Sequence, residues 1–176
     1  MRKFVAALTM IAVAGGFAAL YAQQGKIGVI NSQEVLEKSV EGKKVIARIQ
    51  EKDKQYQASI TKLDDDIRQI QTKLNTQRLT LTEEAAAAAQ ADLDKKTTDR
   101  KRMAEDAYAG MQDLTSRLFK RVQDELIPIV EALGKERGYD LIFDLQKSGA
   151  AWVSPAIDMT AELIKRYDAS KAVPSK

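Results

Sequence analysis

The apolar residues between positions 46 and 81 recur with alternating gaps of three and four residues. The series runs from Ile46 to Leu81, and Asp53 and Gln77 are its only polar members. This spacing places the side chains on one narrow stripe of a helix, which is typical of the seam of a coiled coil. The other faces carry Lys, Gln, Asp, Thr and Arg, so we expect a helix that stands in water with one partner along its seam.

The next segment of the chain supplies that partner. Thr82 is a good N-cap, two glutamates follow where the first helical turn would lie, and five alanines come next. The three–four alternation then returns with smaller side chains. We therefore predict an antiparallel helical hairpin, the arm, over residues 46–125 with its tip near 78–84. A plain dimerising coiled coil is the alternative, but the capped break near residue 80 favours the hairpin.

Two registers of this hairpin fit the pattern. One pairs Ile67 with Leu93, and the other, one heptad longer, pairs Leu74 with Leu93. In the first register, large side chains mostly face small ones, which lets two helices approach closely.

The two ends of the chain predict a small body that contains strands. Short strands are expected at about 26–30, 139–145 and 150–153, and the last two would form a hairpin through a turn at 147–149. Asn31 or Ser32 is placed to cap one helix of this body, and Asp158 is placed to cap the last. The fold class is therefore α+β and mostly α, with long hairpin arms on a small β-rich body.

A proline marks the expected junction of arm and body. Pro128 lies in a run that otherwise predicts helix, where proline removes one backbone hydrogen bond and clashes with the preceding turn. We expect a kink there and interpret Pro128 as a hinge. The body would comprise residues 23–45 and 126–168, and residues 169–176 would form a flexible tail.

So few strands and short helices cannot make an independent core. Open sheet edges and apolar side chains would have to be covered by other copies of the chain. We therefore predict that the body is the oligomerisation surface. The residues expected in or beside the shared core are Ile27, Val29, Ile30, Leu141, Phe143 and Trp152.

The N-terminus has the features of an export signal. Arg2 and Lys3 precede a mostly apolar stretch that ends near the small residue Ala22. A basic start, an apolar middle and a small residue before a polar boundary are typical of a secretory signal peptide, so we expect residues 1–22 to be removed on export. A membrane anchor is the alternative, although the many Ala and Gly residues make the stretch weakly hydrophobic.

Composition excludes several kinds of chemistry. The 176 residues include no His and no Cys, which excludes disulfides, Cys nucleophiles, His-based catalysis and a lipid-anchored lipoprotein. Removing residues 1–22 takes two cations from a net charge of +3 and leaves +1, so no nucleic-acid partner is expected. Gly134 and Lys135 lack the spacing of a phosphate-binding loop, and the three aspartates at 64–66 would point in different directions from a helix. We expect no enzyme activity, metal or cofactor.

A few arm residues are candidates for contact with another protein. Methionine adapts to varied surfaces, and exposed cations and aromatics can add weak contacts. The alternative is that these side chains pack along the seam or form a solvated face. The candidates are Lys95, Arg100, Met103, Tyr108 and Met111.

Four segments together resemble the Skp/OmpH family of periplasmic chaperones. They are Val40–Lys44, Leu81–Ala85, Gly138–Asp144 and Asp158–Leu163, and the resemblance covers the chain after residue 22 in order. It implies a homotrimer with three hairpins around a cavity. It also implies ATP-independent holding of unfolded outer-membrane β-barrel proteins, with possible transient contact with a membrane surface. A structural or tethering coiled coil of the envelope, or a helical regulatory partner, remains an alternative.

Overall fold

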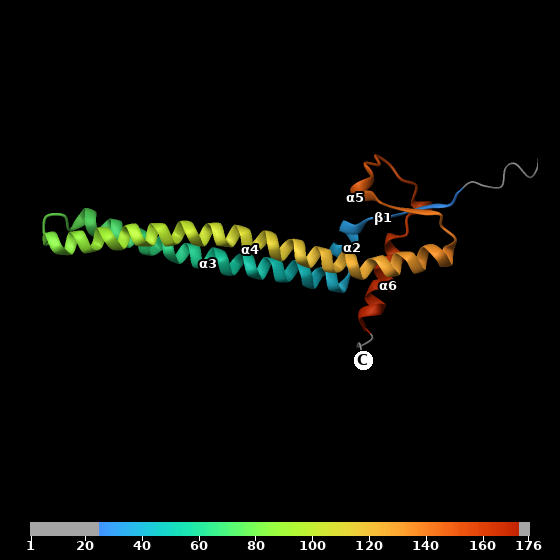
Figure 1. Ribbon diagram of the computed structural model, residues 1–176, viewed down its shortest axis with the longest axis horizontal. Coiled ribbons are helices and arrows are strands. Elements are labelled where there is room, and N and C mark those ends of the chain that lie inside the picture. Colours follow the sequence, from blue (N-terminus) through green and yellow to red (C-terminus); the bar gives the residue numbers. More distant parts are fainter. Residues whose placement is uncertain (1–24, 173–176) are drawn as a thin grey trace, which may run out of the picture.

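The computed structural model describes residues 25–172 as one long arm attached to a small body (Figure 1). The expected signal peptide at 1–22 lies outside these residues. In chain order the elements are β1 (Ile27–Ile30), α2 (Ser32–Lys38), α3 (Val40–Thr76), α4 (Glu83–Arg137), β2 (Leu141–Asp144), α5 (Leu145–Ser148), a 3-10 turn η2 (Pro155–Ile157) and α6 (Thr160–Ala172).

The arm is the predicted antiparallel hairpin. It consists of α3 and the first part of α4, joined by a short loop at 77–82 that forms the tip (Figure 1). The Thr82 side chain accepts a hydrogen bond from the backbone N–H of Ala85, so the predicted cap at the tip is confirmed. The 37 residues of α3 span roughly 55 Å at about 1.5 Å per residue.

The seam of the hairpin follows the predicted alternation with local exceptions. The predicted apolar positions of α3 are half-buried, whereas Asp53 and Gln77 are exposed. At two points the half-buried residue is a lysine next to the expected seam position. Lys52 is half-buried and Asp53 is exposed, and on α4 Lys96 is half-buried and Thr97 is exposed. These lysines can lie at the seam because their aliphatic stems pack while the ammonium group stays in water.

The register lies between the two that were predicted. Lys96 Nζ donates to Asp66 at 2.9 Å and Arg100 Nε donates to Asp64 at 3.0 Å, both across the hairpin. In the first predicted register, each aspartate would face a residue of α4 that comes a few positions before the cation it binds. In the second register, it would face a residue that comes a few positions after that cation. The sequence spacing alone could not choose, because both alternatives satisfy the same apolar stripe.

The helix α4 continues from the tip through Pro128 into the body as one element. Gly138 ends it with φ 65°, the left-handed conformation that glycine adopts without steric cost. The run around Pro128 is therefore the end of the arm helix and no separate element. The hinge at Pro128 remains a prediction.

The sheet of the body differs from the prediction. It has two parallel strands, β1 and β2, in the described residues, with Ile27 opposite Leu141 and Val29 opposite Phe143. The predicted strand at 150–153 and its hairpin are wrong. Asp144 ends β2 and caps α5, because its side chain accepts from the N–H of Gln146, and Gly149 then closes α5 at φ 67°. The chain therefore turns away from the sheet before residue 150.

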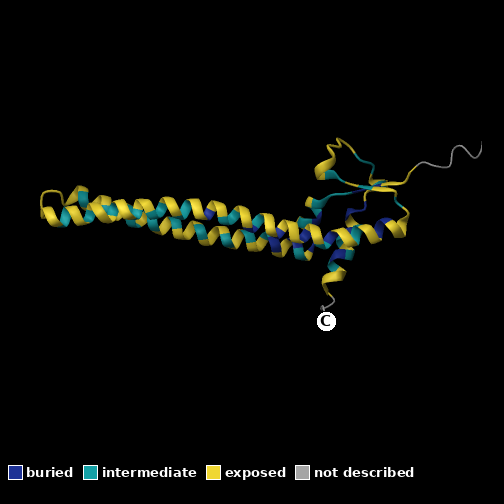
Figure 2. Ribbon diagram, viewed as in Figure 1, coloured by how far each residue is buried: buried dark blue, intermediate teal, exposed yellow. Residues whose placement is uncertain are grey.

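The core lies where the arm meets the body. It joins side chains of α2, α3, α4 and α6, and Figure 2 shows the buried positions gathered there, with exposed and half-buried positions along the arm. One face of α6 contributes to this core, since Leu163 and Tyr167 are fully buried. The helix α6 continues through 169–172 of the expected tail, and 173–176 lie outside the described residues, so the flexibility of the tail stays a prediction. The core members are Val35, Val45, Leu114, Leu118, Val122, Leu126, Leu163 and Tyr167.

The elbow between α2 and α3 is tightly packed. Ser39 is fully buried, and its hydroxyl accepts from the N–H of Gly42 to cap α3. A Cβ built on Gly42 would lie 2.0 Å from the backbone oxygen of Leu36, so only glycine fits. This close approach fixes the direction in which the arm leaves the body.

Candidate functional site

The body carries an apolar groove at the base of the arm, called here the basal groove. Its volume is about 660 Å³, and its walls come from the end of β1, from α2, from the start of α3, and from α4. Phe119 and Ile127 of α4 project into it and stay partly exposed, at 42% and 46%. The apolar lining is Ile30, Leu36, Ile46, Phe119, Val122, Leu126, Ile127 and Val130; the polar rim is Ser32, Gln33, Glu37, Gln123, Glu131, Asp144 and Lys147.

The residues predicted for oligomerisation fall into two groups. Val29 is buried within the single chain, and Ile30 lines the basal groove. The other four are exposed large apolar residues, with Trp152 the most exposed at 80%. A single chain therefore leaves uncovered apolar surface in and around its sheet, beyond the groove itself. These four are Ile27, Leu141, Phe143 and Trp152.

A polar cluster fastens α6 to α4 just before Pro128. Glu125 accepts hydrogen bonds from Tyr167 at 2.6 Å and Arg121 at 3.1 Å, and it lies 2.8 Å from the Lys171 ammonium. Burial opposes ionisation of Glu125, but these donors outweigh it and hold the pKa below its usual value. Burial, and then the hydrogen bond to this carboxylate, raise the pKa of Tyr167. The cluster locks α6 onto the segment of α4 that precedes the predicted hinge.

The candidate contact residues of the arm are not equivalent. Lys95 and Tyr108 are exposed, and the Tyr108 hydroxyl accepts a hydrogen bond from Gln112 of the next turn. Met103 and Met111 are half-buried near the seam, and Arg100 forms the ion pair with Asp64. The five residues therefore do not converge on one patch, and Lys95 and Tyr108 offer the most free surface.

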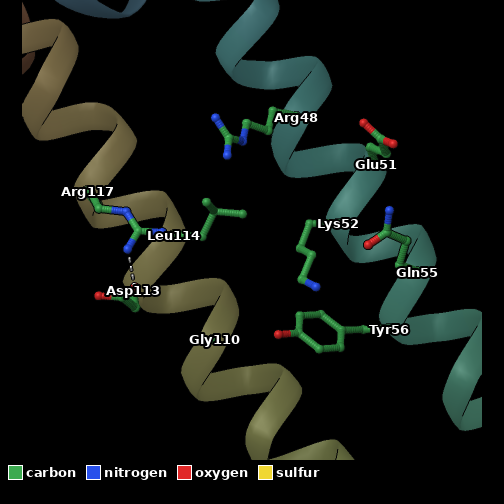
Figure 3. Close-up of a pocket in the computed structure, with 9 residues that line it drawn as sticks. All are labelled: Arg48, Glu51, Lys52, Gln55, Tyr56, Gly110, Asp113, Leu114 and Arg117. Carbon is green, nitrogen blue, oxygen red and sulfur yellow. Dashed lines mark ion pairs between the residues drawn. The ribbon is translucent and has the colours of Figure 1, made fainter.

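A second hollow interrupts the arm close to its base (Figure 3). It has a volume of about 480 Å³ and lies where Tyr56 of α3 points toward Gly110 of α4. Arg117 and Asp113 form an ion pair of 3.3 Å on its α4 side. Its other side is lined by Arg48, Glu51, Lys52 and Gln55 of α3. The lining is polar and open to water, so this hollow is a local gap in the seam.

Sequence reasoning missed both hollows. The basal groove combines residues from two strands and four helices, and no local pattern reveals that they meet. The gap on the arm had one signal, because Gly110 in a helical run leaves space opposite a large residue. In the part of the chain that the structure describes, no cluster of acidic side chains could hold a metal ion. Among the same residues, none of the helices has the length and apolar character needed to cross a membrane.

Comparison with known proteins places the chain in a family. The sequence model of the family described as outer membrane protein (OmpH-like) matches residues 26–167, which include the body and the whole arm. The chain belongs to the OmpH-like family. A search of curated proteins found no match.

A solved structure has the same fold as this OmpH-like chain. It is a crystal structure from Caulobacter crescentus CB15, described as a candidate outer membrane chaperone (OmpH-like). The two share 18% sequence identity with a TM-score of 0.73, over 88% of this chain and 90% of the other. The mostly helical fold with a small sheet is therefore common to both.

Proposed function

We propose that the protein is an ATP-independent holdase chaperone of the periplasm. It binds unfolded outer-membrane β-barrel proteins and prevents their aggregation before they insert into the membrane. Three copies join through their bodies, and the three arms enclose a cavity for the client. Membership of the OmpH-like family supports this assignment, as does a fold shared with a relative described as a candidate outer membrane chaperone.

One feature of the arm carries the proposal. No residue from 46 to 106 is buried, although this stretch forms most of two long helices. A hairpin that covers no core of its own has no role in stabilising the body. It leaves an extended wet surface on both helices, and three such arms on one body can surround a chain without folding it.

The grip on a client must consist of many weak contacts. The charges on the arm are mixed, and several are already paired across the hairpin or along a helix. Contacts of this kind add up when three arms hold one client, because each arm raises the effective concentration for the next. We propose client contact at Lys95, Arg100, Met103, Tyr108 and Met111. Release then needs only competition from the client's own folding.

The tip is the place we propose for transient contact with a membrane surface. Leu79 at the tip is almost completely exposed and lies beside Arg78, so the loop presents an apolar and a basic group together. One such loop binds weakly, which suits a contact that must be reversible.

The test is light scattering of an unfolded outer-membrane β-barrel protein that is diluted from denaturant. The purified protein should suppress the rise in scattering. The matched variant lacks residues 60–73 and 91–104, two heptads from each side of the arm. This deletion preserves the phase of the seam and removes both partners of the two ion pairs that cross the outer part of the arm.

The shortened variant should form the same oligomer in sedimentation and protect small clients, but it should fail with large ones. Equal protection of large clients by the short arms would contradict enclosure. If the full protein leaves scattering unchanged, the holdase role is wrong, and a structural or tethering role in the envelope becomes the better explanation.

A further inference from the structure

Two unlike apolar features of the body remain uncovered in a single chain. One is concave, the basal groove, and the other is the side chain of Trp152 on the loop at 149–154. Figure 1 shows the segment around α5 projecting sideways from the body, across the direction of the arm. An indole that is 80% exposed is unusual, because Trp contributes one of the largest apolar areas of any side chain when it is buried.

The loop itself is weakly tied to its own chain. Ala150 donates to the Ser148 hydroxyl, but the backbone groups of 151–153 form no hydrogen bond with any described residue. The loop is thus held at its two ends, by α5 and by η2. A segment with free backbone donors and acceptors and a large apolar side chain is suited to bind a second surface.

We propose that Trp152 of one copy docks into the basal groove of the next copy. This inference rests on the oligomer in the proposed function and adds the contact that forms it. The loop is also compatible in charge with the groove. The groove rim carries Glu37, Glu131 and Asp144 with one cation, Lys147, whereas the loop 149–154 that bears Trp152 has no charged residue and so brings no acid to this rim.

The symmetry of such a contact also fits. Groove and tryptophan are different surfaces of the same chain, so the contact can run from one copy to the next in one direction. Such heterologous contacts close into a ring when the rotation permits, and in a trimer every groove and every tryptophan is used in turn. In the single chain Trp152 does not fill its own groove, although Lys147, five residues earlier, lies at the rim.

The test uses the fluorescence of Trp152, the only tryptophan in the chain. In the assembled protein its emission should be blue-shifted and several-fold less sensitive to an aqueous quencher than in diluted, dissociated protein. Ile127→Glu places a charge in the groove at a half-exposed site that the single chain tolerates. It should restore strong quenching, whereas Leu79→Ser at the arm tip should leave Trp152 protected.

Mixing separates direct docking from a general loss of assembly. Copies with Ile127→Glu keep Trp152 but have a blocked groove, and copies with Trp152→Ala keep an open groove but emit no tryptophan signal. Mixed together, the two should regain protection of the remaining tryptophan. No recovery in a mixture that sediments as mixed oligomers would overturn the proposal.

Other outcomes also decide between the possibilities. If the oligomer forms but Trp152 stays fully quenchable, the docking contact is wrong while the trimer and the holdase role stand. If Trp152 becomes protected only when unfolded client is added, the loop binds client and self-docking is wrong. If the protein is monomeric at every concentration in sedimentation, the oligomer in the proposed function fails, and the docking contact fails with it.

Discussion

Two glycines in helices of this protein should respond in opposite ways to the same substitution. At Gly42 an added Cβ would lie 2.0 Å from the backbone oxygen of Leu36, in the elbow between α2 and α3. At Gly110 it would lie 2.6 Å from the hydroxyl of Tyr56, which is the far end of a side chain. Both contacts are too short, but the first involves backbone atoms and the second a group that can move away.

The magnitudes follow from what must move. Alanine in place of glycine in a helix contributes about 1 kcal/mol through propensity, and less in the first turn, where Gly42 lies. Relief at Gly42 requires the elbow to open by roughly 1 Å beside the fully buried Val35 and Ser39, and overpacking of this kind costs about 1–3 kcal/mol. Moving Tyr56 away from Gly110 costs about 0.5–1.5 kcal/mol, which the propensity term offsets.

We therefore expect Gly42→Ala to lower the free energy of unfolding by about 1–2.5 kcal/mol and Gly110→Ala to change it by less than about 1 kcal/mol. Urea unfolding followed by circular dichroism measures the difference. With a typical slope of about 2 kcal/mol per molar urea, Gly42→Ala should lower the midpoint by about 0.5–1 M and Gly110→Ala should change it by less than about 0.5 M. Both variants are compared at one protein concentration, because unfolding of an oligomer depends on it.

Two results would refute this reasoning. If Gly42→Ala is as stable as the unchanged protein, the elbow tolerates a side chain and does not fix the direction of the arm. If Gly110→Ala is destabilised to the same extent as Gly42→Ala, the Tyr56 side chain is not free to move, and the gap beside it is rigid. The double variant Tyr56→Phe/Gly110→Ala then identifies the hydroxyl as the obstacle or excludes it.

Four further results are expected. Pro128→Ala restores a backbone donor to α4 and should stiffen the helix at this point. The range of distances between the arms in small-angle scattering should therefore become narrower, and an unchanged distance distribution would contradict a hinge at Pro128. The pKa of Glu125 is lowered in the folded protein, so the ionised carboxylate stabilises the fold. This contribution is complete above the ordinary carboxyl pKa and is lost as pH falls through the pKa of the folded state. The difference in the free energy of unfolding between the unchanged protein and Glu125→Gln should therefore disappear on acidification below about pH 4. Phe143→Asp puts a charge on a residue that is 43% exposed, so sedimentation should show a lost oligomer while the arm stays helical, and a fully oligomeric variant would contradict the placement. Raising salt from low to physiological levels should weaken client binding only modestly, and complete loss would mean that charge dominates the grip.

The arm could be predicted from the sequence because its signal is periodic and long. Apolar residues repeat over more than five turns, and the caps at Thr82 and Gly138 mark helix ends by local chemistry that needs no tertiary contact. The register could not be predicted, because the ion pairs that distinguish the alternatives depend on side-chain reach. Asp64 and Asp66 were expected only to point in different directions from the helix, yet both bind cations of α4.

The sheet was mispredicted for a different reason. Strand β2 looked like the first half of a hairpin because an apolar segment with Trp152 follows after a turn. Its real partner, β1, lies more than a hundred residues earlier, and a parallel pair of this kind requires a crossover, here the whole arm. Local pattern cannot reveal a partner at that distance. The basal groove shares this origin, since α4 and α2 meet only after the crossover is complete.

The distribution of buried residues connects the fold with its proposed use. On α4 the buried side chains begin at Ala107 and continue toward the body, and α3 has none beyond Val45. The free energy that the hydrophobic effect contributes is therefore concentrated at the base, while the outer arm depends on half-buried aliphatic contacts and two ion pairs that water screens. Regions with few buried contacts open at lower cost than the core. The outer arm can consequently splay or bend while the base keeps its direction. In the trimer that we propose, the cavity between the arms would then change its width with the client, and this change would need no energy source.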